Sequence, residues 1–235
     1  MFNGKRILAV VPARGGSKGL KLKNLRKVNG VSLIERVGRV LAEIPWVDRS
    51  IVSTDHEGIG IEAISVGLEK PFVRPKELSG DRVADIDVLA HALKFAEQQD
   101  NVTYDVVLML QPTSPFRRAQ HILDTVSLLT DKGYDSVWTV SPTDTKAHPL
   151  KQLCVSDGKI EHYSPEGGKI IARQQLEPVF HRNGVAYAVN RDLILEEKTL
   201  KSANTGALVL EDFQVSIDTE FDISLAELLE TSMQA

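Results

Sequence analysis

The sequence has very little cysteine and no long apolar run. Cys154 is the only cysteine among 235 residues, which excludes a disulfide framework and a thiolate zinc site within the chain. The longest apolar runs, residues 7–11 and 106–110, are far shorter than the roughly 18 residues of a membrane helix. The first run ends at Pro12, too early for the core of a signal peptide. We therefore expect a cytoplasmic protein without a membrane segment.

Acidic residues are nearly missing from one end of the chain and basic residues from the other. The first 40 residues hold ten Lys or Arg and a single acid, Glu35, whereas residues 205–235 hold seven acids and no Lys or Arg. A basic segment predicts a polyanionic partner. Because glycines rather than aromatic residues separate the basic side chains, the pattern favours a small phosphate ligand over a nucleic acid.

Short apolar runs alternate with helical patterns along most of the chain. A Ser32–Glu35 capping box predicts the first helix, which runs to Ile44. Further helices are expected at 57–68, 85–99, 119–130 and 223–231, and strands at 7–11, 50–53, 106–110, 136–140, 185–189 and 214–217, with a short strand or extended segment at 71–73. The alternation predicts a three-layer α/β fold with a mostly parallel sheet, which binds ligands at the carboxyl ends of its strands.

The alternation stops between Ser141 and Phe180, where four prolines and three glycines occur. This composition predicts an insertion of short strands and loops. We divide the chain into an α/β unit, residues 1–140 and 183–235, and an inserted arm, residues 141–182.

A glycine-rich loop follows the first predicted strand. Residues 11–24 read V-P-A-R-G-G-S-K-G-L-K-L-K-N. Glycines let backbone N–H groups converge on an anion, and Arg14, Lys18 and Lys23 add positive charge. The spacing matches neither GxxxxGK[ST] nor GxGxxG. The loop alone leaves two interpretations open, a phosphate-binding loop or a flexible turn with solvated lysines.

The amino-acid sequence of this loop resembles the nucleotide loop of the CMP-sialic acid synthetases. These are the acylneuraminate cytidylyltransferases, which include bacterial enzymes for legionaminic and pseudaminic acids. Further segments resemble the family in the same order: I-V-S-T-D at 51–55, R-P-x-x-L at 74–78, L-Q-P-T-S-P at 110–115, H-P-L-K at 148–151, R-Q-Q at 173–175, N-G at 183–184 and S-I-D-T-E at 216–220. The resemblance spans nearly the whole chain. It implies a Rossmann-like nucleotidyltransferase fold and transfer of CMP from CTP to the anomeric hydroxyl of a nine-carbon acidic sugar, with release of pyrophosphate.

The resemblance also implies roles for individual residues. Catalytic roles fall to Lys18, Gln111 and Asp218. Nucleotide binding falls to Arg14, Gly15, Gly16, Ser17, Lys23, Asn24, Arg74 and Asp81. Asp218 is the implied ligand of Mg²⁺ or Mn²⁺, although Ser216 stands where the family often has a second aspartate. Two alternatives remain open here: Arg74 in a surface salt bridge, and Asp218 as the cap of the last helix.

Sugar binding is implied for Gln111, Lys151, Arg173, His181 and Asn183. In the family the arm crosses to a partner subunit, so a homodimer is expected, with Lys151 and Arg173 completing the partner's site. The arginine of the family's F-R-x-N-G has moved to Arg182, which leaves the choice between His181 and Arg182 open. No aromatic pair occurs near Thr199 and Leu200, where the family lines its acyl pocket, so the particular nine-carbon acid is also open.

Other classes fit the sequence less well. A CMP-Kdo synthetase would have arginine at the position of Gly19, and a non-catalytic nucleotide-binding protein would not need Lys18, Gln111 and Asp218 together. The D-x-D at 85–87 is typical of glycosyltransferases, but here it opens a predicted helix, where acids interact favourably with the helix dipole.

Overall fold

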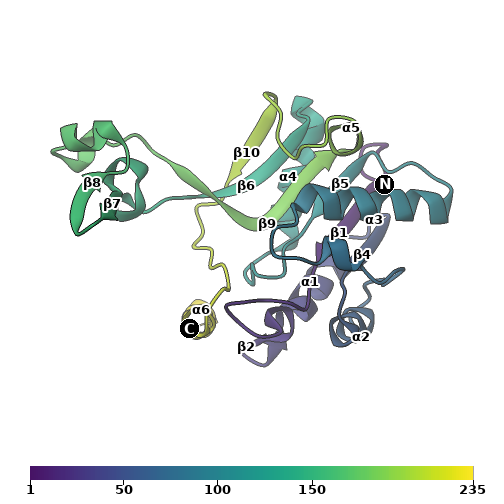
Figure 1. Ribbon diagram of the computed structural model, residues 1–235. Helices are drawn as coiled ribbons and strands as arrows, with labels where there is room; N and C mark the ends of the chain where they lie inside the picture. Colours follow the sequence, from purple (N-terminus) through teal and green to yellow (C-terminus); the bar gives the residue numbers. More distant parts are fainter. Residues whose placement is uncertain (235) are drawn as a thin grey trace.

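The computed structural model describes residues 1–234 and is built on a six-stranded sheet (Figure 1). Its strands are β10 (Thr205–Val209), β6 (Ser136–Pro142), β9 (Phe180–Asn190), β5 (Val106–Met109), β1 (Ile7–Pro12) and β4 (Arg49–Ser53), in that spatial order. Only β9 is antiparallel to its neighbours in this sheet. The predicted mostly parallel sheet is therefore confirmed.

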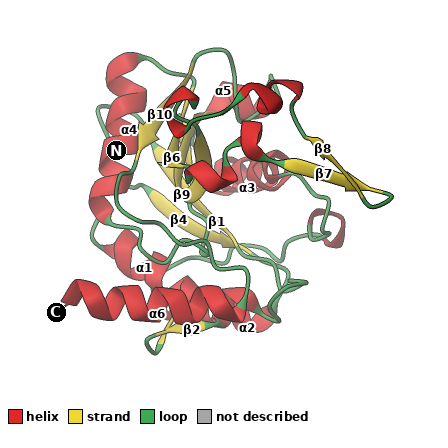
Figure 2. Cartoon of the chain, turned by 90° about the vertical axis from the view of Figure 1, so that its left-hand side faces the viewer, coloured by secondary structure: helices red, strands yellow, loops and turns green. Residues whose placement is uncertain are grey.

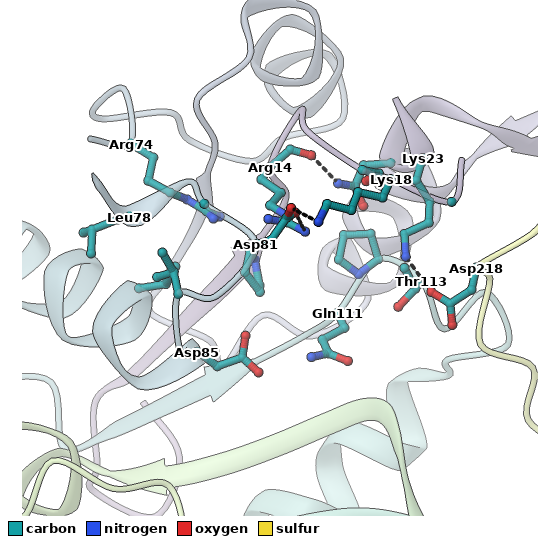
Figure 3. Close-up of a pocket in the computed structure, with 18 of the residues that line it drawn as sticks. Arg14, Lys18, Lys23, Arg74, Leu78, Asp81, Asp85, Gln111, Thr113 and Asp218 are labelled. Atoms are coloured by element: carbon teal, nitrogen blue, oxygen red, sulfur yellow. Dashed lines mark hydrogen bonds and ion pairs between the residues drawn. The ribbon is translucent and has the colours of Figure 1, made fainter. Parts of the chain in front are cut away.

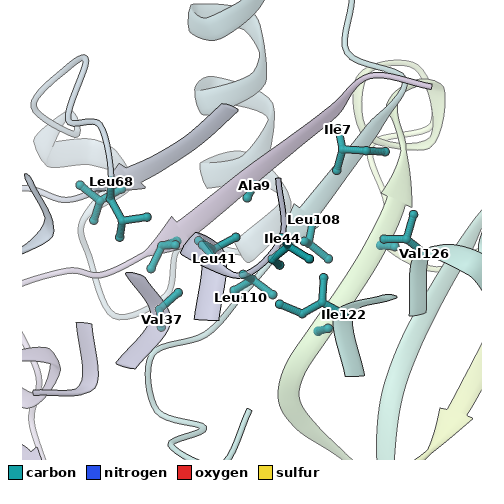
Figure 4. Close-up of a cluster of buried hydrophobic side chains, with 14 of the residues drawn as sticks. Ile7, Ala9, Val37, Leu41, Ile44, Leu68, Leu108, Leu110, Ile122 and Val126 are labelled. Atoms are coloured by element: carbon teal, nitrogen blue, oxygen red, sulfur yellow. The ribbon is translucent and has the colours of Figure 1, made fainter. Parts of the chain in front are cut away.

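Helices cover both faces of the sheet. They are α1 (Leu33–Ala42), α2 (Glu57–Ser65), α3 (Asp85–Asp100), α4 (Ala119–Lys132) and α5 (Arg191–Leu195), whereas α6 (Glu220–Gln234) packs outside the sheet. Ile7, Ala9 and Val11 of β1 pack with α1, α2 and α4, as Figure 4 shows in part, whereas Leu8 and Val10 pack with α3 and α5. A strand buried on both faces is a continuous apolar run, which explains the sequence of β1.

One strand prediction was wrong. Residues 214–217 form no strand, and the sixth strand is β10 instead. Val215 and Ile217 are buried, but they pack with Leu20 and Ile223 in a third apolar cluster outside the sheet. Residues 71–73, expected as a short strand or an extended segment, form no strand. The α1 prediction is confirmed at its start, because Ser32 Oγ accepts a hydrogen bond from Glu35 N–H at 3.0 Å.

The arm leaves the sheet where β6 and β9 extend beyond it (Figure 1). It carries the hairpin β7 (Leu153–Ser156) and β8 (Lys159–His162), whose residues are all exposed, and short 3-10 helices at Thr145–Ala147, Pro149–Lys151, Pro165–Lys169 and Arg173–Gln175. The division into two units stays a prediction, and so does the arm's role.

The basic and acidic ends of the chain meet. Helix α6 lies beside the small hairpin of β2 (Lys27–Val28) and β3 (Val31–Ser32), as Figure 2 shows. Arg26 pairs with Glu220 at 2.6 Å, and Arg36 pairs with Glu230 at 2.8 Å. Part of the basic charge is thus balanced within the chain rather than by a partner. Among residues 1–234, no helix has the length and hydropathy needed to cross a membrane.

Candidate active site

A cavity of about 520 Å³ opens at the carboxyl ends of β1 and β5 (Figure 3). It is lined by the loop after β1, by residues between β4 and the first turns of α3, by the loop after β5 and by the segment before α6. Ligands of parallel α/β sheets bind at this edge. The cavity brings together nine of the sequence-predicted residues: Arg14, Ser17, Lys18, Lys23, Asn24, Arg74, Asp81, Gln111 and Asp218.

The loop after β1 supplies the cationic end of the cavity. Gly15 N–H donates to the Asp55 carboxylate at 2.8 Å, and the Asn24 amide donates to the Arg14 carbonyl at 3.0 Å. A Cβ on Gly19 would lie 2.8 Å from the Asp218 carbonyl oxygen, so glycine allows the loop to approach the segment before α6. These contacts hold Arg14, Lys18 and Lys23 around one space, as a phosphate-binding loop requires.

An acid occupies that space. The Asp81 carboxylate lies 2.7 Å from Lys18 Nζ and 2.8 Å from Arg14 Nη2. The hydrogen bond from Lys18 is the main cause that lowers the pKa of Asp81, with Arg14 acting in the same direction. Asp81 therefore stays ionised and neutralises part of the charge that a phosphate group would meet.

Arg74 lies at the other end of the cavity. Its Nε donates to Ser53 Oγ at 2.9 Å and its Nη2 donates to the Ser53 carbonyl. Burial lowers its pKa to about 10, so it remains a cation at neutral pH. Because Arg74 is only 5% exposed and forms no ion pair with the residues that the structure describes, the surface salt-bridge alternative is wrong.

Gln111 is held by a buried arginine that sequence reasoning missed. Arg117 is 5% exposed, and its guanidinium donates to the carbonyls of Gln111, Gly184 and Val185 at 2.5, 3.0 and 2.5 Å. Burial lowers its pKa to about 9. Gly184 has a φ of +72°, and a Cβ there would lie 2.5 Å from Gln111 Oε1. An arginine just after a proline turn gives no sequence signal of burial.

Asp218 points into the cavity near Lys23, with Lys23 Nζ 2.7 Å from Oδ1 (Figure 3). The helix-cap alternative is wrong, because Thr219 Oγ1 accepts the hydrogen bond from Asp222 N–H, and the Asp222 carboxylate accepts from Asp218 N–H and Thr219 N–H. Asp218 is thus available to a ligand.

The metal-ligating side chains of the cavity suit a metal ion that a polyphosphate and water also coordinate. The described residues contain no group of three His, Cys, Asp or Glu that could hold a metal ion. Asp218 supplies one carboxylate, and Ser216 also lines the cavity. Mg²⁺ is commonly bound by one or two carboxylates together with substrate phosphates and water. A metal bound jointly by Asp218 and a polyphosphate fits this set.

Four predicted sugar-binding residues lie outside this cavity. Lys151 and Arg173 line a second cavity of about 270 Å³ within the arm. His181 is exposed beside Thr143, and Arg182 stacks over Trp138 with its guanidinium carbon 5.5 Å from the ring centroid. The buried Asn183 amide bonds to Thr139, Ser141 and Val185. Their roles in sugar binding stay predictions, as does the choice between His181 and Arg182.

The comparisons with known proteins agree with one another. A family model described as Cytidylyltransferase matches residues 8–232. The CMP-N,N'-diacetyllegionaminic acid synthase of Legionella pneumophila is 33% identical over 98% of this chain and 99% of its own length. An N-acylneuraminate cytidylyltransferase of Streptococcus agalactiae is 31% identical over 92% of this chain and 51% of its own length. A solved structure of a CMP:2-keto-3-deoxy-manno-octonic acid synthetase complexed with CTP has a TM-score of 0.72 and 16% identity, covering 97% of this chain and 99% of that one. That last likeness concerns the fold alone.

Proposed function

Because the chain belongs to the cytidylyltransferase family, we propose that it is a cytoplasmic enzyme that transfers CMP from CTP to the anomeric hydroxyl of a nine-carbon acidic sugar. The cavity carries this proposal. It has a cationic end lined by Arg14, Lys18 and Lys23, a buried arginine at the other end, and Gln111 between them. Relatives named for legionaminic and acylneuraminic acids support a nonulosonic acid as the acceptor.

The reaction needs no covalent intermediate with the protein. The anomeric hydroxyl attacks the α-phosphorus and loses its proton to water, the bond to the bridging oxygen of the β-phosphate breaks, and pyrophosphate leaves. Positioning and charge neutralisation account for most catalysis of phosphoryl-type transfers. Arg14, Lys18 and Lys23 would hold the triphosphate, Asn24 the ribose and Gln111 the sugar. Asp218 would hold Mg²⁺ or Mn²⁺, which when bound withdraws charge from the phosphate oxygens.

The test is pyrophosphate release with CTP, Mg²⁺ and one sugar acid at a time. The panel contains N-acetylneuraminic acid, its deaminated analogue, N,N'-diacetyllegionaminic acid, pseudaminic acid and the eight-carbon acid Kdo. We expect release that depends on one nine-carbon acid. Release with Kdo alone would favour the CMP-Kdo synthetase alternative. CTP binding without release from any of the five would contradict the proposal and favour a non-catalytic nucleotide-binding protein.

The Asp81 carboxylate at the cationic end leads to a prediction about nucleotide affinity. A triphosphate has to displace Asp81 from Lys18 and Arg14 before it can bind them. Asp81→Asn removes the competing charge, so we expect the Kd for MgCTP to fall about threefold or more in calorimetric titrations. Asp87→Asn is the control, because Asp87 is an exposed acid that does not line the cavity. Weaker binding in Asp81→Asn would show instead that Asp81 contributes to nucleotide binding.

The arm makes a second prediction, which rests on a homodimer. Lys151 and Arg173 line the second cavity within the arm and not the active-site cavity of their own chain. The arm also exposes apolar residues such as Val155, Ile160 and Ile171. We propose that the arm packs against a second copy and brings both cations to its sugar site. Lys151→Ala should then raise the KM for the sugar acid more than the KM for CTP. Lys159→Ala, an exposed lysine on β8, should change neither.

Two results would contradict the arm assignment. One is a Lys151→Ala enzyme whose KM for CTP rises more than its KM for the sugar acid. The other is a wild-type enzyme that remains active while sedimentation velocity shows only monomers at the assay concentration.

A further inference from the structure

The side chain of Gln111 is held by packing rather than by hydrogen bonds of its own. Gln111 follows β5, lines the active-site cavity and lies between Asp85 and Thr113 in Figure 3. Its amide group forms no hydrogen bond with the residues that the structure describes. The amide is therefore free to bind a ligand, and the backbone and the neighbouring groups decide where it points.

The loop that carries Gln111 is bonded to β9, the strand that returns from the arm. Gln111 N–H donates to the Gly184 carbonyl at 3.2 Å, and the Ser114 hydroxyl donates to the Asn183 carbonyl at 2.7 Å. The Arg117 guanidinium donates to the carbonyls of both Gln111 and Gly184. Apart from Gln111 these residues are buried, where hydrogen bonds are stronger than in water. The loop and the strand are therefore fixed to each other.

Gly184 lies directly against the Gln111 side chain. Its φ is +72°, a conformation that favours glycine, and its N–H donates to Tyr187 Oη at 2.9 Å, which fixes this part of the strand. A Cβ on Gly184 would lie 2.5 Å from Gln111 Oε1 and 2.8 Å from Ser114 Oγ, closer than van der Waals contact allows. The glycine therefore provides the space that the Gln111 amide occupies.

We propose that Gly184 is a positioning residue, which sets the orientation of the Gln111 amide for hydrogen bonding to the sugar acid. The inference rests on the proposed function, in which Gln111 binds the sugar. Gly184 does not line the cavity, so it acts through Gln111 and not on the substrate. A methyl group at this position would push the amide aside, and a misplacement of about 1 Å can cost about 100-fold in rate. The cationic end of the cavity belongs to other segments, so nucleotide binding is unaffected.

The test compares two glycine-to-alanine variants of the full chain. Gly184→Ala should raise the KM for the panel acid that supports pyrophosphate release by about tenfold or more, while calorimetry finds the Kd for MgCTP within about twofold of wild type. Gly133→Ala is the matched control, because Gly133 has a φ of +64° but a Cβ there meets no atom within 4 Å. Both variants strain the backbone in the same way, so Gly133→Ala should lose stability in urea denaturation without a change in either constant.

A double-mutant cycle decides whether Gly184 acts through Gln111. Gln111→Ala alone should raise the KM for the sugar acid. Adding Gly184→Ala to it should change that KM by less than about twofold, because the oxygen that the new methyl group displaces is gone. Ser114→Ala gives a second, milder variant. It removes the 2.7 Å hydrogen bond to the Asn183 carbonyl and should raise the KM for the sugar acid by about threefold, with an unchanged Kd for MgCTP.

The outcomes separate this inference from the proposed function. A wild-type KM for the sugar acid in folded Gly184→Ala would overturn it, and if that variant does not fold, a wild-type KM in Ser114→Ala would do so. Equal rises in the KM for the sugar acid and the Kd for MgCTP would also overturn it, as would additive effects of Gly184→Ala and Gln111→Ala. If the wild-type enzyme releases pyrophosphate with no acid of the panel, the proposed function fails, and the inference fails with it.

Discussion

Replacing Asp218 with asparagine should lower kcat by about 100-fold or more while CTP still binds. Removal of a single well-placed charge-stabilising group costs this much in many enzymes. The asparagine amide keeps the shape of the side chain but cannot balance the charge of a divalent ion. It also weakens the pairing with Lys23, whose Nζ lies 2.7 Å from Asp218 Oδ1, so the Kd for CTP should stay constant or fall. Stopped-assay pyrophosphate release and calorimetry measure the two effects separately.

Glu220 offers a matched control for Asp218. It is an exposed acid two residues further along the chain, and it pairs with Arg26 rather than lining the cavity. Glu220→Gln should retain wild-type kcat and the wild-type dependence of rate on Mg²⁺ concentration. An Asp218→Asn enzyme with unchanged kcat would contradict the metal-binding role.

Replacing Arg117 with methionine should lower the free energy of unfolding by about 2–4 kcal/mol. The guanidinium donates to three carbonyl groups in the buried junction between β5 and β9. Methionine removes these hydrogen bonds and leaves the Gln111 and Gly184 carbonyls with longer ones, from Ser114 N–H at 3.3 Å and Gln111 N–H at 3.2 Å. Each lost hydrogen bond to a charged group costs about 1.5–3 kcal/mol. Relief of the buried positive charge offsets part of this loss. For a chain of this size, the melting temperature should fall by about 2–4 °C per kcal/mol.

Arg118 is the natural control, because it is the neighbouring arginine, has a 59% exposed side chain and pairs with Asp212 at the surface. Arg118→Met should change the free energy of unfolding by less than about 0.5 kcal/mol. Urea denaturation of the two variants beside wild type checks the prediction. Equal stability of Arg117→Met and Arg118→Met would show that the carbonyls of Gln111, Gly184 and Val185 find other donors.

The parts of the site that lie close together in the sequence could be predicted from it. The loop after β1 carries its glycines and cations within a few positions, and the strand before it is a plain apolar run. Asp218 and Gln111 could be assigned only through resemblance to a family, since each is a single side chain beside a strand end or a helix start. The local sequence does not distinguish a side chain that binds a metal or substrate from one that caps a helix.

What the sequence hid depends on contacts between distant segments. The pairing of Asp81 with Arg14 and Lys18 joins residues more than 60 positions apart, and no period or motif encodes it. Residues 214–217 have the composition of a strand, but tertiary packing against Leu20 and Ile223 decides their place. The sequence carried no signal of β10, because its residues alternate irregularly between buried and exposed and Gly206 interrupts the run. In the structure the ring of Tyr134 covers that glycine.

The sequence predicted a polyanionic partner from the charge asymmetry, and the structure adds ion pairs within the chain. Lys23, Arg26 and Arg36 meet acids of the C-terminal segment, which balances much of the N-terminal charge within the chain. Arg14 and Lys18 remain at the cavity, where Asp81 is their ion-pair partner among the described residues. The basic segment therefore pairs with the C-terminal acids and also supplies the cations of the cavity.

The most direct test of the central claim follows the phosphorus atoms of CTP. Two reactions are run with MgCTP and the nonulosonic acid that supports pyrophosphate release, one labelled with ³²P at the α-phosphate and one at the γ-phosphate. We predict that the α-label appears in a CMP-sugar and the γ-label in pyrophosphate. A γ-label on the sugar would indicate a kinase, and an α-label confined to free CMP would indicate a hydrolase. Either result would contradict cytidylyl transfer.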